Sequence, residues 1–277
     1  MDSINCKGKL LSLDEPVVMG IINATPDSFY QGHLPLSIDE ILLLAGKMIS
    51  DGAAILDIGG QSTKPGSERI SAQQETDRIL PVIESIHAAF PQTILSVDTY
   101  QSAVAKVAVH TGASIVNDIS AGNMDEDMLT TVAALQVPYI CMHMQGTPAT
   151  MQKNPVYTDV VKEVLDFFIL KITECTAAGI KDIIIDPGFG FGKTVEHNFQ
   201  LLKHLPVFGI TNKPVLVGLS RKSVINKTLG IKAADALNGT TVLNSTALMN
   251  GASILRVHDV KEAKEAITLY NTYKKAP

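Results

Sequence analysis

The stretch Ile183-Ile184-Ile185-Asp186-Pro187-Gly188 places a carboxylate, a proline and a glycine directly after three β-branched apolar residues. An apolar run without alternating polar residues is typical of a parallel strand that is buried on both faces. A polar residue that follows such a strand lies at its carboxyl end, where α/β proteins bind their ligands. The stretch therefore predicts a parallel α/β fold with functional residues just after its strands.

Seven other apolar runs in the chain end in a polar residue in the same way. Together the eight endings are Asn23, Asp57, Asp98, Asn117, His143, Asp186, Ser220 and Arg256. Apolar residues at helical spacing lie between the runs, as in Ile38–Ile49, which follows a predicted capping box of Ser37 and Glu40. We expect a (β/α)8 barrel (TIM barrel), because its eight strand ends would bring all eight polar residues to one rim.

An open, doubly wound sheet is the main alternative fold, since it also alternates strands with helices. The count of eight strands and the polar residue at every ending favour the barrel. The short interval between Asp98 and Asn117 predicts a short helix over Gln101–Thr111, and the long one after His143 predicts an extra loop over Gln145–Tyr157.

The composition is that of one globular domain without a nucleic-acid or membrane surface. The chain has 277 residues, of which 45% are hydrophobic, and one barrel of this kind takes about 250 residues. No Pro/Ser/Gly linker or charge block divides the chain, so we expect a single domain over 1–277. A net charge of −5 without a Lys/Arg run disfavours nucleic acids and anionic membranes as partners.

The cysteines and the N-terminus predict a cytoplasmic protein. Residues 1–7 contain no apolar signal core, and no apolar run approaches the roughly 20 residues of a membrane span. Cys6, Cys141 and Cys175 are odd in number and lack the spacing of a metal or redox site. We therefore expect three free thiols in a reducing compartment.

A glycine-rich segment over 186–194 follows the strand quoted above. Gly188, Gly190 and Gly192 permit positive φ and close approach of the backbone to another group. The spacing is not the dinucleotide fingerprint, and Gly188 is one residue short of the Walker spacing before Gly192-Lys193-Thr194. We therefore exclude a nucleoside triphosphate site. A plain turn capped by Asp186 is the alternative.

Cations gather after the last two strands. Ser220-Arg221-Lys222-Ser223 enters a helical stretch, whose N-terminus attracts anions. Strand alternation puts Arg256 and His258 on one side, and such a pair suits a phosphate or diphosphate. The alternatives are a solvated Arg-Lys pair at 221–222 and a cap of the last helix by His258 and Asp259.

Three other predicted strands end in a side chain that accepts hydrogen bonds. Asp98, Asn117 and Asp186 suit a planar ligand with an amino group and ring N–H donors, although each alone is more often a helix N-cap. We interpret Asp57 as a structural residue that positions the loop after it. His143 has no second His or Cys at metal-ligand spacing, and we expect it to support the site rather than to catalyse.

Two loops after strands have the composition of lids. They run over 23–32 and 59–67 and are rich in Ser, Thr, Gly and Pro. Both would lie over the carboxyl ends of the strands, where lids exclude water from a site. Ordinary turn chemistry explains their prolines and glycines but not their clustered hydroxyls.

Taken in order, these segments resemble the dihydropteroate synthase family from Gly20 to Val260. Each motif alone is weak, but the ordered set is highly specific. The matching segments are Gly20–Phe29, Gly59–Thr63, Val97–Thr99, Asn117–Ser120, Met142–Pro148, Asp186–Lys193, Ser220–Ser223 and Arg256–Asp259.

The resemblance implies an enzyme of folate biosynthesis, a sulfonamide target built as a homodimer of (β/α)8 barrels. The family joins 6-hydroxymethyl-7,8-dihydropterin diphosphate to p-aminobenzoate and releases diphosphate, with Mg²⁺ as cofactor. It also implies the residue roles. Asp98, Asn117, Asp186 and Lys222 would bind the pterin. Thr63, Arg256 and His258 would hold the diphosphate, and Asn23 would help to bind Mg²⁺. Pro65, Phe191, Lys222 and Ser223 would border the p-aminobenzoate pocket. The catalytic residues would be Lys222, Arg256, His258 and Asp98.

Departures from the family's pattern lie in the two loops. Tyr30-Gln31 replace the usual Ser-Asp, and Gln61 and Lys64 replace Glu and Arg. These changes alter the charge of the lids and put their contacts in question. Two other functions stay open: a methyltetrahydrofolate-dependent methyltransferase-like barrel, which would not need Arg256 and His258, and a non-catalytic pterin-binding relative, which should have lost a diphosphate or metal residue.

Overall fold

The computed structural model describes residues 3–25, 37–63 and 66–277, and eight parallel strands form its centre. The strands are β3 (Val17–Asn23), β4 (Ala53–Gly59), β5 (Ile94–Asp98), β6 (Ile115–Asp118), β7 (Tyr139–Met142), β8 (Ile183–Asp186), β9 (Leu216–Val217) and β10 (Ile254–Val257). They pair in the order β8-β7-β6-β5-β4-β3-β10-β9, and a parallel bridge from Ile185 to Val215 closes the ring. The predicted (β/α)8 barrel is confirmed, and an open sheet is excluded.

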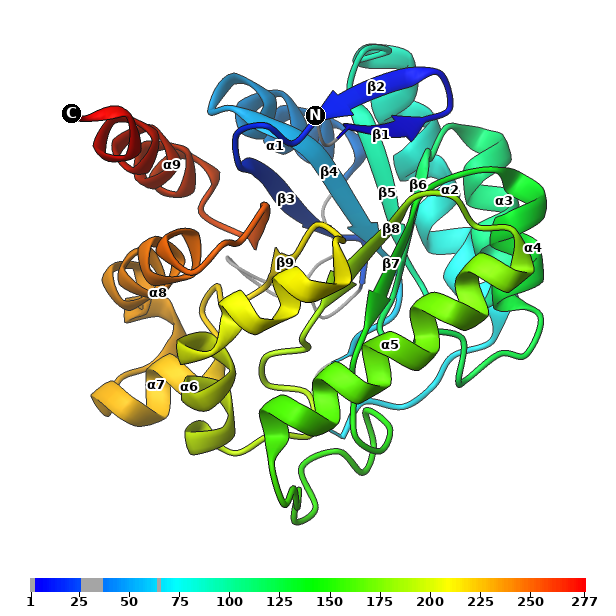
Figure 1. The fold of residues 1–277 in the computed structure, drawn as a ribbon. Helices are drawn as coiled ribbons and strands as arrows, with labels where there is room; N and C mark the ends of the chain where they lie inside the picture. Colours follow the sequence, from blue (N-terminus) through cyan, green and yellow to red (C-terminus); the bar gives the residue numbers. More distant parts are fainter. Residues whose placement is uncertain (1–2, 26–36, 64–65) are drawn as a thin grey trace.

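Helices surround this barrel (Figure 1). They are α1 (Ile38–Ser50), α2 (Ala72–Ala89), α3 (Ser102–Thr111), α4 (Met128–Leu135), α5 (Val160–Ala178), α6 (Val195–Lys203), α7 (Ser223–Leu229), α8 (Leu237–Met249) and α9 (Val260–Lys275). Two 3-10 segments, Leu205–Thr211 and Ala233–Asp235, lie between them. The capping box of Ser37 and Glu40 starts α1 as predicted, α3 is the predicted short helix, and 145–157 form a loop. No helix in the described part of the chain is long and apolar enough to cross a membrane.

One apolar layer fills the barrel at the amino-terminal ends of its strands. Each strand contributes one buried residue to it: Met19, Ile55, Ile94, Ile115, Ile140, Ile184, Leu216 and Ile254. The hairpin of β1 (Ser3–Cys6) and β2 (Lys9–Ser12) packs Ile4, Cys6 and Leu11 against this layer (Figure 1). The hairpin therefore closes one end of the barrel, which leaves the carboxyl end for ligands.

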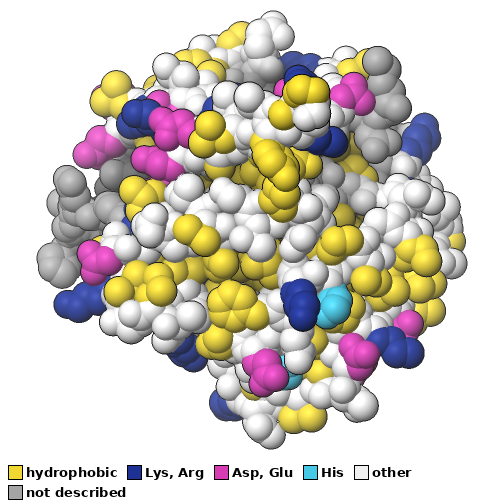
Figure 2. Space-filling model, turned by 60° about the vertical axis from the view of Figure 1, so that its left-hand side comes forward, with side chains coloured by type: hydrophobic (Ala, Val, Ile, Leu, Met, Phe, Trp, Pro, Cys, Tyr) yellow, Lys and Arg dark blue, Asp and Glu magenta, His cyan; other side chains and the backbone are white. Residues whose placement is uncertain are grey.

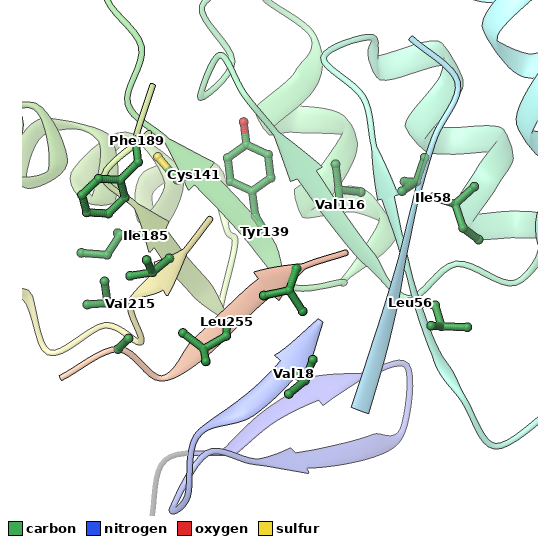
Figure 3. Packing of buried hydrophobic residues seen from close by; sticks show 14 of the residues in the cluster. Val18, Leu56, Ile58, Val116, Tyr139, Cys141, Ile185, Phe189, Val215 and Leu255 are labelled. Atoms are coloured by element: carbon green, nitrogen blue, oxygen red, sulfur yellow. The ribbon is translucent and has the colours of Figure 1, made fainter. Parts of the chain in front are cut away.

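The opposite faces of the strands pack against the helices. Leu56, Val116 and Ile185 alternate with the inward residues and belong to a second core cluster, which Figure 3 shows in part. Burial of a side chain of this size stabilises the fold by roughly 1.5–3 kcal/mol. Strands buried on both faces explain why their sequences are continuously apolar.

The inward face turns polar two residues beyond the apolar layer. There the alternation places Asp57, Ser96, Asn117, Asp186 and Arg256 inside the barrel. The first four are buried and Arg256 is half-buried. A polar layer of this kind above an apolar one is the floor of a binding site.

Candidate active site

Arg256 lies between two aspartates inside the barrel. Its Nε donates to Asp57 Oδ2 at 2.7 Å, and its Nη2 donates to Asp98 Oδ2 at 2.7 Å. Asn117 Nδ2 donates to the same Asp57 oxygen at 3.0 Å. The predicted structural role of Asp57 is confirmed, but the side chains that it holds are Arg256 and Asn117 rather than those of the following loop. Asp57 is fully buried and orients Arg256 and Asn117, which alternation from Ile55 could have indicated.

The three predicted acceptors lie on one rim. Asp98 and Asn117 are register partners in β5 and β6, and Asn117 and Asp186 are only 4% and 5% exposed. Burial raises the pKa of Asp98 to about 7 despite the opposing charge of Arg256. Burial also raises the pKa of Asp186, against the charge of Lys222 and a hydrogen bond from the Gly188 amide. Buried carboxylates of this kind favour a ligand that brings its own donors.

The glycine-rich turn owes its glycines to close packing. Gly188 has φ +70°, and a Cβ there would lie 1.9 Å from the carbonyl oxygen of His143. Gly192 has φ +62°, and its Cβ would lie 2.4 Å from the carbonyl oxygen of Gln145. Asp186 Oδ1 accepts from the Gly188 amide at 2.8 Å, so the residue also caps the turn. The turn is thus pressed against the loop that follows β7.

Gly188→Ala is expected to destabilise the protein by more than the left-handed backbone alone costs. Gly230 at the end of α7 is a matched control, because it has φ +67° and nothing within 4 Å of a Cβ. Gly230→Ala should cost about 1–2 kcal/mol from its φ alone. Gly188→Ala must in addition push a main-chain carbonyl away. Equal losses of unfolding free energy in denaturant melts would contradict this assignment.

Lys193 is a buried amine that the sequence analysis assigned no role. It is 3% exposed and donates to the carbonyls of Gly188 and Phe191, both at 3.0 Å. Its Nζ also lies 2.9 Å from His143 Nδ1. Burial lowers the pKa of Lys193 to about 7 and that of His143 to about 2, so the imidazole is neutral and Nδ1 accepts. His143 therefore supports the turn, as expected; for Lys193 the only sequence signal was a lysine directly after the third glycine.

Lys222 and Phe191 meet beside this turn. The Nζ atom of Lys222 lies 4.7 Å from the centroid of the Phe191 ring and donates to the Phe189 carbonyl. Burial lowers the pKa of Lys222 to about 8, while the Asp186 carboxylate opposes the shift. Ser223 is the exposed first residue of α7. The structure therefore brings together the predicted pair of Phe191 and Lys222.

Arg221 is paired with a carboxylate and its side chain is only 12% exposed, so the alternative of a solvated Arg-Lys pair is wrong for it. Its Nε and Nη2 donate to the two carboxylate oxygens of Asp259 at 2.8 and 2.7 Å, and Nη1 donates to the Ala233 and Ala234 carbonyls. Asp259 makes no side-chain cap for α9, so that alternative is wrong too. The pair joins two loops, and only Lys222 of the two cations serves the barrel.

His258 lies just past β10 and is exposed. The His258 amide donates to Ser220 Oγ at 3.2 Å, and this hydroxyl lies 3.1 Å from the ring Nδ1, to which it can donate, so that the ring N–H is at Nε2. The surrounding protein atoms and the charge of Arg256 lower its pKa to about 4, so the ring is neutral at pH 7. A neutral ring at the rim can donate to an anion without a fixed charge.

Of the remaining predicted residues, Asn23 ends β3 and Thr63 follows β4 at the carboxyl end of the barrel. Asn23 is level with Gly59 in the neighbouring strand, and Gly59 is level with Asp98. Thr63 is half-buried in the loop after β4. Pro65 lies outside the described residues, as do Lys64, Tyr30-Gln31 and most of the first predicted lid. Among the described residues, no three His, Cys, Asp or Glu side chains cluster as metal ligands.

Gln61, one of the departures from the family's pattern, anchors the second loop. It is 8% exposed, and its Nε2 donates to the carbonyls of Ser62 and Glu68 at 2.8 and 2.9 Å. Its Oε1 accepts from the Ile70 amide at 2.9 Å. An ionised glutamate has no donor, so it could not make the first two bonds.

The arrangement separates two kinds of chemistry. Acceptors lie deep in the barrel, where a flat ligand with N–H donors can be held. Arg256 lies in the same inward layer, and the neutral imidazole of His258 lies at the exposed rim, and both can stabilise an anionic group. The ring of Phe191 and the amine of Lys222 together form a separate aromatic and cationic surface.

Comparison with known proteins gives a consistent result. The model of the pterin binding enzyme family matches residues 19–258. The dihydropteroate synthase of Escherichia coli is 43% identical over 263 residues, which cover 94% of this chain and 93% of that protein. The enzyme of Haemophilus influenzae is 42% identical over 264 residues, or 95% of either chain.

Solved structures agree over the full length. The Yersinia pestis dihydropteroate synthase in complex with a sulfonamide drug superposes with a TM-score of 0.95 at 41% identity, and covers 99% of this chain and 100% of that one. The Xanthomonas albilineans enzyme in complex with 7,8-dihydropteroate has a TM-score of 0.90 at 38% identity and covers 100% of both chains.

Proposed function

The chain belongs to the pterin binding enzyme family, and we propose that it acts as a dihydropteroate synthase. It would join 6-hydroxymethyl-7,8-dihydropterin diphosphate to p-aminobenzoate and release diphosphate. The observation that carries the proposal is a nearly buried pair of acceptors, Asn117 and Asp186, inside a barrel that also holds the cations Lys222 and Arg256. Neither a methyltransferase-like barrel nor a binding-only relative has an observation in its favour.

The pterin would lie on the acceptor floor. The carboxylate of Asp186 would accept from the pterin amino group and a ring N–H, and Asn117 would bind the same edge. Asp98 is the third acceptor, with a pKa near 7 that lets it hold or release a proton at physiological pH. Lys222, which acts electrostatically on Asp186, would contact the carbonyl side of the ring.

The reaction needs charge stabilisation more than a strong base. The bond between the exocyclic methylene and the diphosphate oxygen breaks, and both electrons leave with the diphosphate. The arylamine nitrogen of p-aminobenzoate forms the new bond with its own lone pair and loses one proton to solvent. Arg256, His258 and Thr63 would bind the leaving group. Arg256 donates to Asp57 through Nε and to Asp98 through Nη2, so its Nη1 is left to donate to the diphosphate.

Mg²⁺ fits this arrangement as an ion brought in with the substrate. Magnesium usually keeps several waters and binds through one or two protein oxygens together with substrate phosphates. The exposed amide of Asn23 at the rim offers one such protein oxygen and suits that mode. The ion would add positive charge beside the departing diphosphate.

We further propose a cytoplasmic homodimer. All three cysteines are free, in keeping with a reducing compartment. Apolar side chains are exposed on the last two helices: Val242 and Met249 on α8, and Leu269 and Tyr273 on α9. Figure 2 shows hydrophobic side chains over the side of the molecule on which these helices lie. An apolar face of this kind supports association, which sedimentation of the wild type would test.

A diphosphate-release assay tests the proposed function. Release from pterin diphosphate should depend on p-aminobenzoate, and 7,8-dihydropteroate should form in equal amount. Release at the same rate without the arylamine, and no dihydropteroate with it, would refute the synthase activity.

We expect p-aminobenzoate to bind more tightly when diphosphate and Mg²⁺ are present. The anion should draw in the loop residues that complete the second pocket, which couples the two sites. Couplings of this kind are typically about 1–3 kcal/mol, or roughly 5- to 150-fold in affinity. Calorimetric titration with and without diphosphate and Mg²⁺ measures the effect, and equal affinities would rule it out.

A further inference from the structure

All five main-chain carbonyls of the glycine-rich turn 188–192 accept a hydrogen bond from a side chain. In chain order the donors are Lys193 (3.0 Å), Lys222, Gln152 (2.7 Å), Lys193 again (3.0 Å) and Tyr157 (2.8 Å). Surface turns usually leave such groups to water. In this turn, side chains of the protein occupy every carbonyl instead.

The donors come from three separate parts of the chain. Gln152 and Tyr157 belong to the loop between β7 and α5, and Lys222 precedes α7. Lys193 follows the turn and bonds two of its carbonyls at once. On the amide side, Gly190 donates to Asn198 Oδ1 at 2.7 Å. The turn therefore cannot shift without breaking several bonds.

These hydrogen bonds to the turn fix the position of the Phe191 side chain. It is half-buried, packs against the small cluster of Tyr100, Ile119 and Met142, and lies under the amine of Lys222. The Gly188 and Phe191 carbonyls that Lys193 holds are three residues apart, on either side of the bend. The orientation of the Phe191 ring thus depends on Lys193, a residue only 3% exposed whose amine is bonded to protein groups.

We propose that Lys193, assisted by Gln152 and Tyr157, is a positioning residue for the arylamine substrate. It acts through the main chain of the turn on Phe191 and Lys222, and it does not touch the substrate. The proposal rests on the proposed function, since it assigns p-aminobenzoate to the surface of Phe191 and Lys222. It predicts that the two substrates respond differently to loss of the amine.

Lys193→Met keeps the aliphatic stem and removes the donors. We expect the KM for p-aminobenzoate to rise about tenfold or more, because the carbonyls of Gly188, Phe191 and His143 and the His143 ring nitrogen lose this donor. The Kd of pterin diphosphate with Mg²⁺, measured by calorimetry, should change less than threefold. Lys203→Met on the exposed face of α6 is the control and should leave both constants unchanged.

Two further variants test the proposal if Lys193→Met does not fold. Tyr157→Phe and Gln152→Leu each remove one hydrogen bond to the turn. Each should raise the KM for p-aminobenzoate about two- to fivefold at unchanged pterin affinity. A parallel loss of both affinities, or a lowered melting temperature with unchanged KM, would overturn the proposal, because the hydrogen bonds to the turn would then be merely structural. If the wild type itself binds no pterin diphosphate, the proposed function fails instead.

Discussion

Arg256→Lys is expected to lower kcat/KM about 10-fold or more, although the charge is kept. A guanidinium can donate to Asp57, Asp98 and an anion at once, whereas an ammonium is a single point that cannot span them. A charged bidentate contact contributes roughly 1.5–3 kcal/mol, which sets the size of the loss. Steady-state kinetics of the lysine variant measure it. Wild-type kinetics would show that Arg256 does not serve the diphosphate.

Arg256→Met should show what the arginine does for the fold. It leaves Asp57 and Asp98 buried without a cation, which typically costs about 3–5 kcal/mol. The pKa of Asp98 is already raised to about 7 by burial, and loss of the arginine raises it further. The charged form of Asp98 carries this extra cost, so for this group the deficit against the wild type opens only as the pH rises above the wild-type folded pKa of about 7. The stability deficit against the wild type should therefore be larger at pH 8 than at pH 5, and denaturant melts at the two values would contradict the assignment if the deficits were equal.

Asp186→Asn is expected to weaken pterin binding about 10- to 100-fold, with little change in stability without ligand. The amide keeps an oxygen for the Gly188 N–H but presents its own NH2 group to one of the pterin donors. A mismatched buried donor costs roughly 1–3 kcal/mol, and more where a charge is involved. Calorimetry with pterin diphosphate, together with thermal melts, measures both effects.

Asp182→Asn is the matched control for that experiment. Asp182 lies just before the same strand and accepts from the Asn5 amide at the closed end of the barrel. It should leave pterin binding unchanged. If Asp186→Asn unfolds the protein while its folded fraction binds pterin normally, Asp186 is only the cap of the turn.

The strand pattern allowed the barrel and its rim to be predicted because both depend on short-range regularities. Runs such as Ile183–Ile185 must be buried on both faces, and eight of them leave no open edge when the ring closes. Asp98 and Asn117 are level with each other in β5 and β6, and Asp186 ends β8 two strands further on, because parallel strands bring their carboxyl ends to one rim. The roles of these residues toward pterin, diphosphate and p-aminobenzoate came from the ordered family motifs rather than from spacing.

Side-chain partnerships were decided by the tertiary structure alone. Asp57 and Arg256 are 199 residues apart, and Lys193 and His143 are 50 apart, so no local pattern links them. Arg221 looked like Lys222 in sequence, yet closure of the barrel brings Asp259 to one and Asp186 near the other. The sequence by itself determined which residues reach the rim, through alternation and burial. Which of those charges are neutralised by protein partners and which remain for a ligand depends on distances across the barrel, and these exist only once the ring has closed.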